Sequence, residues 1–221
     1  MSSNSTPPIS PLLRPTRFPE EVILALDEIN RDLPGGTARK LLLSKIRENN
    51  SLCVVTGQQL GVAGGPLLTL VKALAVVQKS KHLEQELNRP VVPIFWLQSE
   101  DHDYEEVRSI NLPPKIGTND SEVLKIDLPA NDERTPLGAR FIDESITLLY
   151  KTFLTHLSSE RLENLSALSG SLQAGERWTN SFTKLLASFL GESQLLFLDP
   201  RHKALIGLRR NLIANAFHHR K

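Results

Sequence analysis

Residues 54–74, VVTGQQLGVAGGPLLTLVKAL, change from a strand pattern to a helix pattern within a few positions. The run 51–56 is apolar and rich in β-branched residues, which is typical of a strand buried on both faces. From Pro66 to about residue 78 the pattern is helical and apolar nearly all round, which indicates a buried helix. A second apolar run follows at 90–97. This order predicts a βαβ unit with parallel strands and a right-handed crossover, and hence an α/β fold.

The remaining segments predict further helices and strands around this unit. We expect, in chain order, a helix that begins at Pro19 and is ended by the PGG of 34–36, a helix over 37–48 with Thr37 as its N-cap, an edge strand at 122–128, helices at 142–157 and 175–190, a third strand at 194–199 and a final helix from about Pro200. One face of the helix at 175–190 carries Trp178, Phe182, Leu185, Leu186 and Phe189, a stripe that we interpret as core packing rather than a cofactor site.

Length and composition limit the domain organisation and the partners. The chain has 221 residues and is 40% apolar, enough for one α/β domain with at most a small appendage. Residues 1–17 are rich in proline and serine and predict a flexible arm. Residues 18–221 would form the α/β core.

Charge and hydropathy disfavour two kinds of partner. Lys and Arg number 26 against 25 Asp and Glu, a net charge of +1, so no nucleic acid is expected as a partner. No apolar run approaches the ~20 residues of a membrane helix, and the N-terminus lacks the apolar core of a signal peptide, so we expect a cytoplasmic protein that does not enter membranes. The single cysteine, Cys53, excludes a disulfide framework and is interpreted as a small buried core residue.

Each of the three best strands ends in a polar cluster. The clusters read TGQQLGVAGG, QSEDHD and DPRH. In open parallel sheets, ligands bind beyond the carboxyl ends of the strands. If the three strands share one sheet, the clusters therefore meet at one edge and form a ligand site.

The first cluster is a glycine loop that suits an anion. Its glycines allow positive φ and close approach of a ligand, and Pro66 fits the start of the following helix, whose free N–H groups favour phosphate or carboxylate. A side chain at Gly65 should block that approach, whereas a methyl group at Gly61 should be milder. Lys72, the one charge in the helix, either reaches toward an anion or extends to solvent. The alternative for the whole loop is a tight turn without a ligand.

The second cluster places five carboxylates around His102, in SEDHDYEE at 99–106. A metal site is one interpretation, but no second histidine lies at ligand spacing, and none is predicted. Another is that His102 contacts phosphate or acts as acid or base, with Asp103 binding a substrate amine. The alternative is an acidic helix cap, formed by Asp101 or Asp103.

Taken together, these segments resemble the BshC family of cysteine ligases of bacillithiol biosynthesis. The resemblance rests on VTGQQLGVAGGPLLTLVKAL, on PVVPIFWLQSEDHDYEEV and more loosely on ERWTNSFTKLLASFLGESQLLFLDP, and it covers roughly 50–200. The sequence departs from the family pattern at Ala63, Gly64 and Ser99, none of which is a polar group that we assign to the chemistry. Family members are much longer, so the chain resembles their N-terminal, Rossmann-like part.

The resemblance implies that residues 18–221 form a Rossmann-like core similar to nucleotidyltransferases and class I aminoacyl-tRNA synthetases. This core would have an inserted segment around 112–175 and an incomplete C-terminal end. It implies that cysteine is joined through its carboxylate to the amine of glucosaminyl malate, with ATP as the cofactor and Mg accompanying the nucleotide. It further implies a homodimer formed through a coiled coil that this chain lacks.

Mapped onto this sequence, the family's site has two catalytic residues, with His102 steadying negative charge and Asp103 orienting the amine. The substrate- and nucleotide-binding residues would be Gly57, Gln58, Gln59, Gly61, Gly65, Pro66, Lys72, Gln98, Asp101 and Asp199. Two other functions remain open: another adenylate-forming or nucleotidyltransferase-like enzyme, and a non-catalytic nucleotide-binding fragment.

Overall fold

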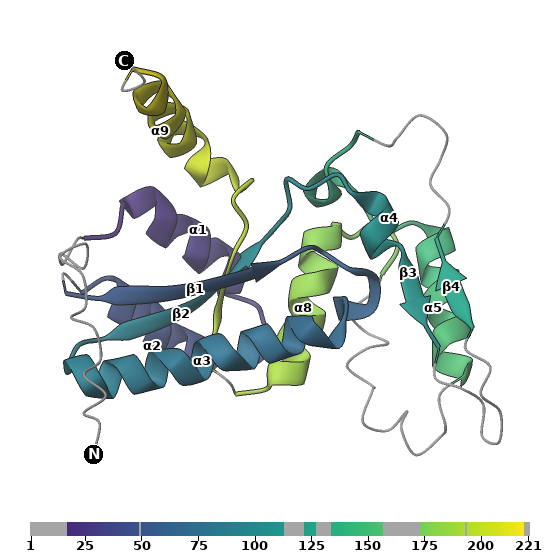
Figure 1. Cartoon of the computed structure of the whole chain (residues 1–221), viewed down its shortest axis with the longest axis horizontal. Helices are drawn as coiled ribbons and strands as arrows, with labels where there is room; N and C mark the ends of the chain where they lie inside the picture. Colours follow the sequence, from purple (N-terminus) through teal and green to yellow (C-terminus); the bar gives the residue numbers. More distant parts are fainter. Residues whose placement is uncertain are drawn as a thin grey trace, which may run out of the picture.

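The centre of the protein is a parallel sheet of three strands, in the order β1–β2–β5 (Figure 1). The structure is a computed structural model that describes residues 17–48, 50–112, 122–126, 134–156, 173–192 and 194–218. The strands are β1 (Leu52–Gln58), β2 (Val91–Leu97) and β5 (Leu196–Leu198). Leu52 is paired with Val91, and Ile94 with Leu196, so the three predicted strands share one sheet as expected.

Helices cover both faces of this sheet. On one face, α3 (Leu67–Leu87) and α8 (Trp178–Leu190) pack against Phe95 and Leu97 of β2. On the other face, α1 (Glu20–Asn30) and α2 (Gly36–Ile46) pack against Val92 and Ile94. Alternate residues of a strand point to opposite faces, so β2 is buried on both sides. This arrangement is α/β with a parallel sheet, and β1, α3 and β2 form the predicted βαβ unit.

One face of β1 is exposed, which the sequence did not predict. The burial of β1 alternates, and Val55 is 52% exposed. Helix α1 packs mainly on β5 and α2 on β2, so neither covers that face of β1. The prediction of a strand buried on both faces is therefore wrong. The prediction that Cys53 belongs to the core is wrong for the same reason, since its side chain is exposed.

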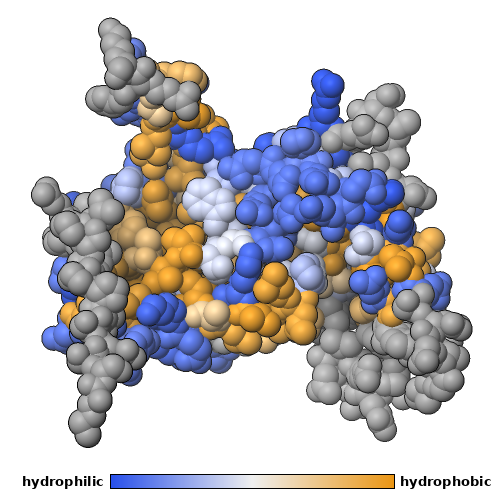
Figure 2. Space-filling view, viewed as in Figure 1, coloured by the Kyte–Doolittle hydropathy of each residue, from blue (hydrophilic) through white to orange (hydrophobic). Residues whose placement is uncertain are grey.

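Helix α3 is buried on one face only, although its start is apolar nearly all round. Ala73, Val76 and Val77 are buried against the sheet. The exposed apolar residues of the helix are Leu67, Leu68, Val71 and Leu74. Figure 2 shows apolar surface over α3 and over α9. The prediction of a fully buried helix is wrong, and the helix is also longer than predicted.

The predicted helix starts and the predicted apolar stripe of α8 are close to those of the structure and differ in a few positions. Pro19 and Pro66 stand at the N-cap of α1 and α3, one residue before the predicted position, and Gly35 rather than Thr37 caps α2. In α8, Trp178, Phe182, Leu185 and Leu186 are buried core residues, whereas Phe189 is 44% exposed.

The remaining described elements lie to one side of the sheet or follow it. They are the 3-10 turn η1 (Val62–Gly64), α4 (Tyr104–Val107), β3 (Ser109–Asn111), β4 (Val123–Lys125), η2 (Leu137–Ala139), α5 (Glu144–His156), η3 (Lys203–Leu205) and α9 (Ile206–His218). Strand β4 was predicted; it pairs antiparallel with β3, which was not. Helix α9 starts later than predicted, projects from the body and has no buried residue (Figure 1).

Several expectations fall outside what the structure describes. The predicted arm at 1–17 lies almost entirely outside the described residues, as does much of the predicted insert. Among the described helices, none is long and apolar enough to cross a membrane.

A buried side chain of α1 closes the outer side of β5. The Asn30 amide donates to the carbonyl of Phe197 at 2.8 Å, and its oxygen accepts from the Phe197 N–H at 2.9 Å. The same amide also donates to the Leu26 carbonyl. Asn30 is 1% exposed, so it satisfies two backbone groups of the sheet that water does not reach.

Candidate ligand site at the carboxyl edge of the sheet

The glycine loop between β1 and α3 has an unusual backbone. Ala63, Gly64 and Gly65 have φ of 55°, 87° and 77°, three successive left-handed residues. The amide of Gly61 bonds to the Gln59 carbonyl, and that of Gly65 to the Val62 carbonyl. These two glycines therefore shape the loop and do not offer free donors to a ligand.

Two glycines of the loop are required by close backbone approach. A Cβ at Gly61 would lie 2.5 Å from the Cα of Gly65, and one at Gly57 would lie 2.7 Å from the Trp96 carbonyl oxygen. A Cβ at Gly65 would lie 3.0 Å from Oγ1 of Thr69. The expectation that a methyl group at Gly61 would be mild is therefore wrong, because it would strike backbone that cannot rotate away.

Free donors are instead present at the start of α3. Within the residues that the structure describes, the amides of Leu67 and Leu68 have no hydrogen-bond acceptor. The first N–H groups of a long helix lack partners within the helix and attract anions. A cleft of about 640 Å³ adjoins them. Its lining includes Gln58, Gln59, Gly61, Gly65, Pro66 and Glu106.

Lys72 points toward this loop. Its Nζ lies 2.7 Å from Oε1 of Gln58 and 3.2 Å from the carbonyl oxygen of Gly57. The interpretation that Lys72 extends to solvent is therefore wrong. The half-buried ammonium group adds positive charge at the end of β1 and holds the Gln58 side chain.

Gln59 connects the glycine loop to the acidic loop after β2. Its amide donates to Oδ2 of Asp101 at 2.9 Å and to Oε2 of Glu106 at 2.6 Å. Oδ1 of Asp101 accepts from the Asp103 amide, and this bond, followed by the one from Gln59, lowers the pKa of Asp101. The Asp101 carboxylate is thus ionised, and both of its oxygens accept hydrogen bonds from the protein. Asp101 therefore positions the loop.

His102 and Asp103 are exposed and follow directly in the same loop. Asp103 stands at the N-cap of α4, but its side chain makes no capping hydrogen bond. The capping alternative therefore does not apply to Asp103. Neither residue lines the cleft of the glycine loop, and neither does Gln98, although the Gln98 amide donates to the Gln58 carbonyl at 3.2 Å.

The third cluster is tied to the second through Ser99. The buried Ser99 hydroxyl donates to Oδ1 of Asp199, and the Arg201 amide donates to the same oxygen at 2.9 Å. The turn η2 covers this junction, because the Gly138 amide donates to the Ser99 carbonyl at 2.9 Å. A Cβ at Gly138 would lie 2.6 Å from that of Ser99, so only glycine fits.

The three strand-end clusters thus meet at one edge, as predicted. The first and the third cluster border different clefts, and no residue of the second cluster, 98–103, lines either of them. Asp199 lines a second cleft of about 630 Å³, which none of the predicted glycine-loop residues lines. The expected single pocket with three walls is corrected to two neighbouring clefts. Among the described residues, no group of three or more His, Cys, Asp or Glu is placed to hold a metal ion.

Sequence reasoning missed Ser99, Glu106, Gly138 and Arg201 as parts of this edge. Ser99 and Arg201 lie inside the clusters QSEDHD and DPRH, so their position in the sequence was a usable signal. Gly138 lies far away in the sequence, and nothing in its local pattern indicates where it packs.

A parallel α/β sheet with a glycine loop before a helix, and with polar loops gathered at its carboxyl edge, defines a Rossmann-like domain. Comparison with known families makes this assignment specific. Residues 12–221 match the family described as "Bacillithiol biosynthesis BshC, N-terminal Rossmann-like domain", and the chain belongs to this family.

Two relatives illustrate the extent of the similarity. Both carry the name "Putative cysteine ligase BshC". The protein of Heliobacterium modesticaldum is 35% identical over 168 residues, covering 75% of this chain and 30% of the relative. The protein of Exiguobacterium sibiricum is 30% identical over 203 residues, covering 89% of this chain and 38% of the relative. The chain thus spans about a third of the length of these relatives.

Proposed function

We propose that this domain carries the catalytic edge of a ligase that joins the carboxylate of cysteine to the amine of glucosaminyl malate, with ATP as the energy source. The names of the relatives support the reaction class. The observation that carries the proposal is the bond from Gln59 to Asp101, because it joins the glycine loop to the loop that bears His102 and Asp103. The proposed anion site and the exposed side chains of His102 and Asp103 would thereby share one edge of the sheet.

The residues around the glycine loop fit a phosphate group. The free amides of Leu67 and Leu68, the bare backbone at Gly65 and the charge of Lys72 are suited to hold it, next to a cleft of about 640 Å³. Bound ATP, with Mg²⁺, would supply the activation that a free carboxylate needs before an amine attacks it. Adenylate and acyl-phosphate activation both fit this arrangement.

His102 and Asp103 are the proposed catalytic residues. A hydrogen bond donated by the His102 ring would steady the negative charge that develops on the carboxyl oxygen. The Asp103 carboxylate would accept a hydrogen bond from the attacking amine and orient it. Both side chains are exposed, and Asp103 makes no capping bond, so neither is needed for the fold. The proposal places the reaction in the cytoplasm, in a homodimer formed through a coiled coil outside this chain.

The test uses His102→Ala and Asp103→Asn in the longest polypeptide that the gene encodes. We expect both variants to keep the melting temperature of the wild type and to lose product formation. Glu100→Gln is the matched control, because it removes a neighbouring exposed carboxylate and should keep activity. Product analysis should show the amide of cysteine with glucosaminyl malate. A nucleotidyl-transfer product, or full activity in both variants, would refute the assignment.

A further inference from the structure

The second cleft lies between α1, α8 and the connection from β5 to α9. Its volume of about 630 Å³ is in the range of pockets that hold drug-sized ligands, and exceeds what a free amino acid needs. The glycine loop lines a different cleft. The second cleft therefore has room for a second substrate besides the nucleotide.

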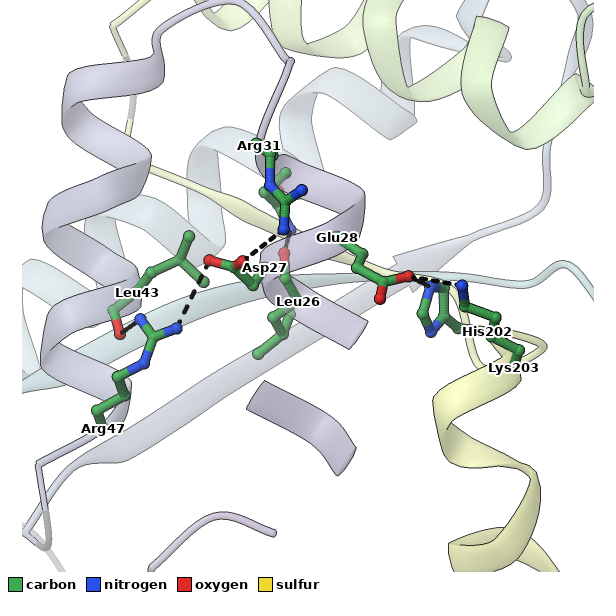
Figure 3. A network of polar contacts seen from close by, with 9 residues as sticks. Leu26, Asp27, Glu28, Arg31, Leu43, Arg47, His202 and Lys203 are labelled. Carbon is green, nitrogen blue, oxygen red and sulfur yellow. Dashed lines mark hydrogen bonds and ion pairs between the residues drawn. The ribbon is translucent and has the colours of Figure 1, made fainter. Parts of the chain in front are cut away.

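Part of the charge around this cleft is neutralised by the protein itself. Figure 3 shows that Glu28 of α1 meets both His202, at 3.2 Å, and Lys203, at 3.3 Å. Lys184 of α8 is paired with Glu176. The contacts of Glu28 hold α1 against the start of η3.

Four charged groups of the lining, Asp32, Arg177, Asp199 and Arg201, have no ion pair among the described residues, and two of them, Asp199 and Arg201, lie close together in the chain. In the described part of the chain, the half-buried Arg201 guanidinium has no hydrogen-bond or ion-pair partner. Both bonds to the Asp199 carboxylate go to Oδ1, so its Oδ2 accepts none from the described residues. One free cation and one free carboxylate oxygen thus lie two residues apart.

This pair of groups selects a ligand that carries both signs of charge. An unpaired guanidinium binds a carboxylate with two parallel hydrogen bonds, and a carboxylate oxygen accepts from an ammonium or amine. The first turns of α8 add Thr179, Asn180 and Thr183 to the lining, which suits the hydroxyl groups of a sugar. The carboxylates of Asp199 and Asp32 disfavour the phosphates of a nucleotide.

We propose that this second cleft binds the acceptor of the ligation, an amino sugar that carries carboxylates, with Arg201 on a carboxylate and Asp199 on the amine. The inference rests on the proposed function for the identity of the acceptor. Asp199 is bonded to Ser99 in the loop after β2, so the amine end of the ligand adjoins the loop that bears His102 and Asp103.

The test is calorimetric titration of the 221-residue chain without ATP, using glucosaminyl malate and malate as separate probes. We expect Arg201→Gln to lower the affinity for both ligands at least tenfold. Asp199→Asn should lower the affinity for glucosaminyl malate and leave the affinity for malate unchanged, because malate has no amine. Arg210→Gln on α9, outside the cleft, is the matched control and should bind like the wild type. Melting curves check each variant, because Asp199 also holds the turn at Arg201.

The outcomes separate this inference from the proposed reaction. The inference is overturned if the wild type does not bind glucosaminyl malate or if Arg201→Gln binds it with the affinity of the wild type. It is also overturned if Arg201→Gln lowers the affinity for ATP instead. If the wild type binds glucosaminyl malate through Arg201 but the full polypeptide forms no amide, the ligase proposal fails and the binding site stands. If the amide forms and Arg201→Gln leaves the KM for glucosaminyl malate unchanged, the ligase stands and the site assignment fails.

Discussion

Lys72 and Gln58 are in direct contact, with 2.7 Å between the ammonium nitrogen and the side-chain oxygen. Lys72 belongs to α3 and Gln58 is the last residue of β1, so the helix holds the end of the strand that precedes it. The contact also places a positive charge beside the backbone of the glycine loop, where we propose that a phosphate binds.

We expect Lys72→Met to loosen this loop and to weaken nucleotide binding. Loss of hydrogen bonds from a charged group should lower the free energy of unfolding by about 1–2 kcal/mol. ATP titration should show weaker binding, but a smaller loss than for Gly65→Val. Lys79→Met, an exposed position of the same helix, is the control and should change neither quantity. Unchanged ATP affinity in Lys72→Met would mean that the charge serves only the loop.

Substitutions at the loop glycines should separate loop shape from ligand approach. Gly61→Ala should lower the free energy of unfolding by about 1–3 kcal/mol, because its methyl group meets the Gly65 backbone. Gly65→Val forces a β-branched residue to a φ of 77°. It should lower the affinity for ATP at least tenfold, a loss of about 1.4 kcal/mol of binding free energy.

The control for these glycines is Gly207→Ala in α9, where a Cβ meets nothing within 4 Å. Alanine is the better helix former, so this variant should gain about 0.5–1 kcal/mol in stability and bind ATP normally. Urea unfolding and calorimetric titration measure the two effects on the same samples. A folded Gly65→Val that binds ATP like the wild type would show that the loop is a turn without a ligand.

Asn30→Ala should be among the more damaging substitutions outside the apolar core. It leaves the N–H and the carbonyl of Phe197 buried without partners, at a cost of about 2–4 kcal/mol. Asn215→Ala on the exposed helix α9 is the matched control and should stay within about 0.5 kcal/mol of the wild type. Thermal and urea unfolding provide the comparison, and equal stability of the two variants would contradict the role of Asn30.

Cys53 should react with thiol reagents in the folded protein, because its side chain is exposed. Neighbouring strand residues still remove part of its water, and this desolvation raises the pKa of the thiol. A raised pKa leaves less thiolate at neutral pH, so the rate should be low at pH 7 and should still increase above pH ~8.5. Iodoacetamide labelling followed by mass spectrometry measures it, with Cys53→Ser as the blank. If Cys53 is labelled only in denaturant, its side chain is buried in the folded protein, as the sequence analysis expected.

The sequence was sufficient to predict the sheet and the meeting of the polar clusters at its carboxyl edge. The apolar runs that became β1, β2 and β5 are short and bounded by polar clusters, and the stretch between the first two has the period of a helix. Parallel strands have their carboxyl ends at one edge, so the meeting of the clusters followed from the order of elements alone.

Burial and side-chain partners were not predictable from one sequence. An apolar residue such as Val55 has the same local pattern whether or not a helix covers it, and the cover depends on where α1 and α2 pack. The contact of Gly61 with Gly65 depends on three successive positive φ angles. The bond from Ser99 to Asp199 joins residues 100 positions apart in the chain. Such relationships arise only when the elements are assembled.

Asn30 also decides in which direction the sheet can grow. Because its side chain occupies both backbone groups of Phe197, no further strand can pair with β5 there. Among the described strands, β1 has a partner on one side only, so its other side is a template for an added strand. The edge of the sheet at β5 is thus blocked, and the edge at β1 is open to strand pairing. Intermolecular pairing of unfolded or crowded chains should therefore start at β1.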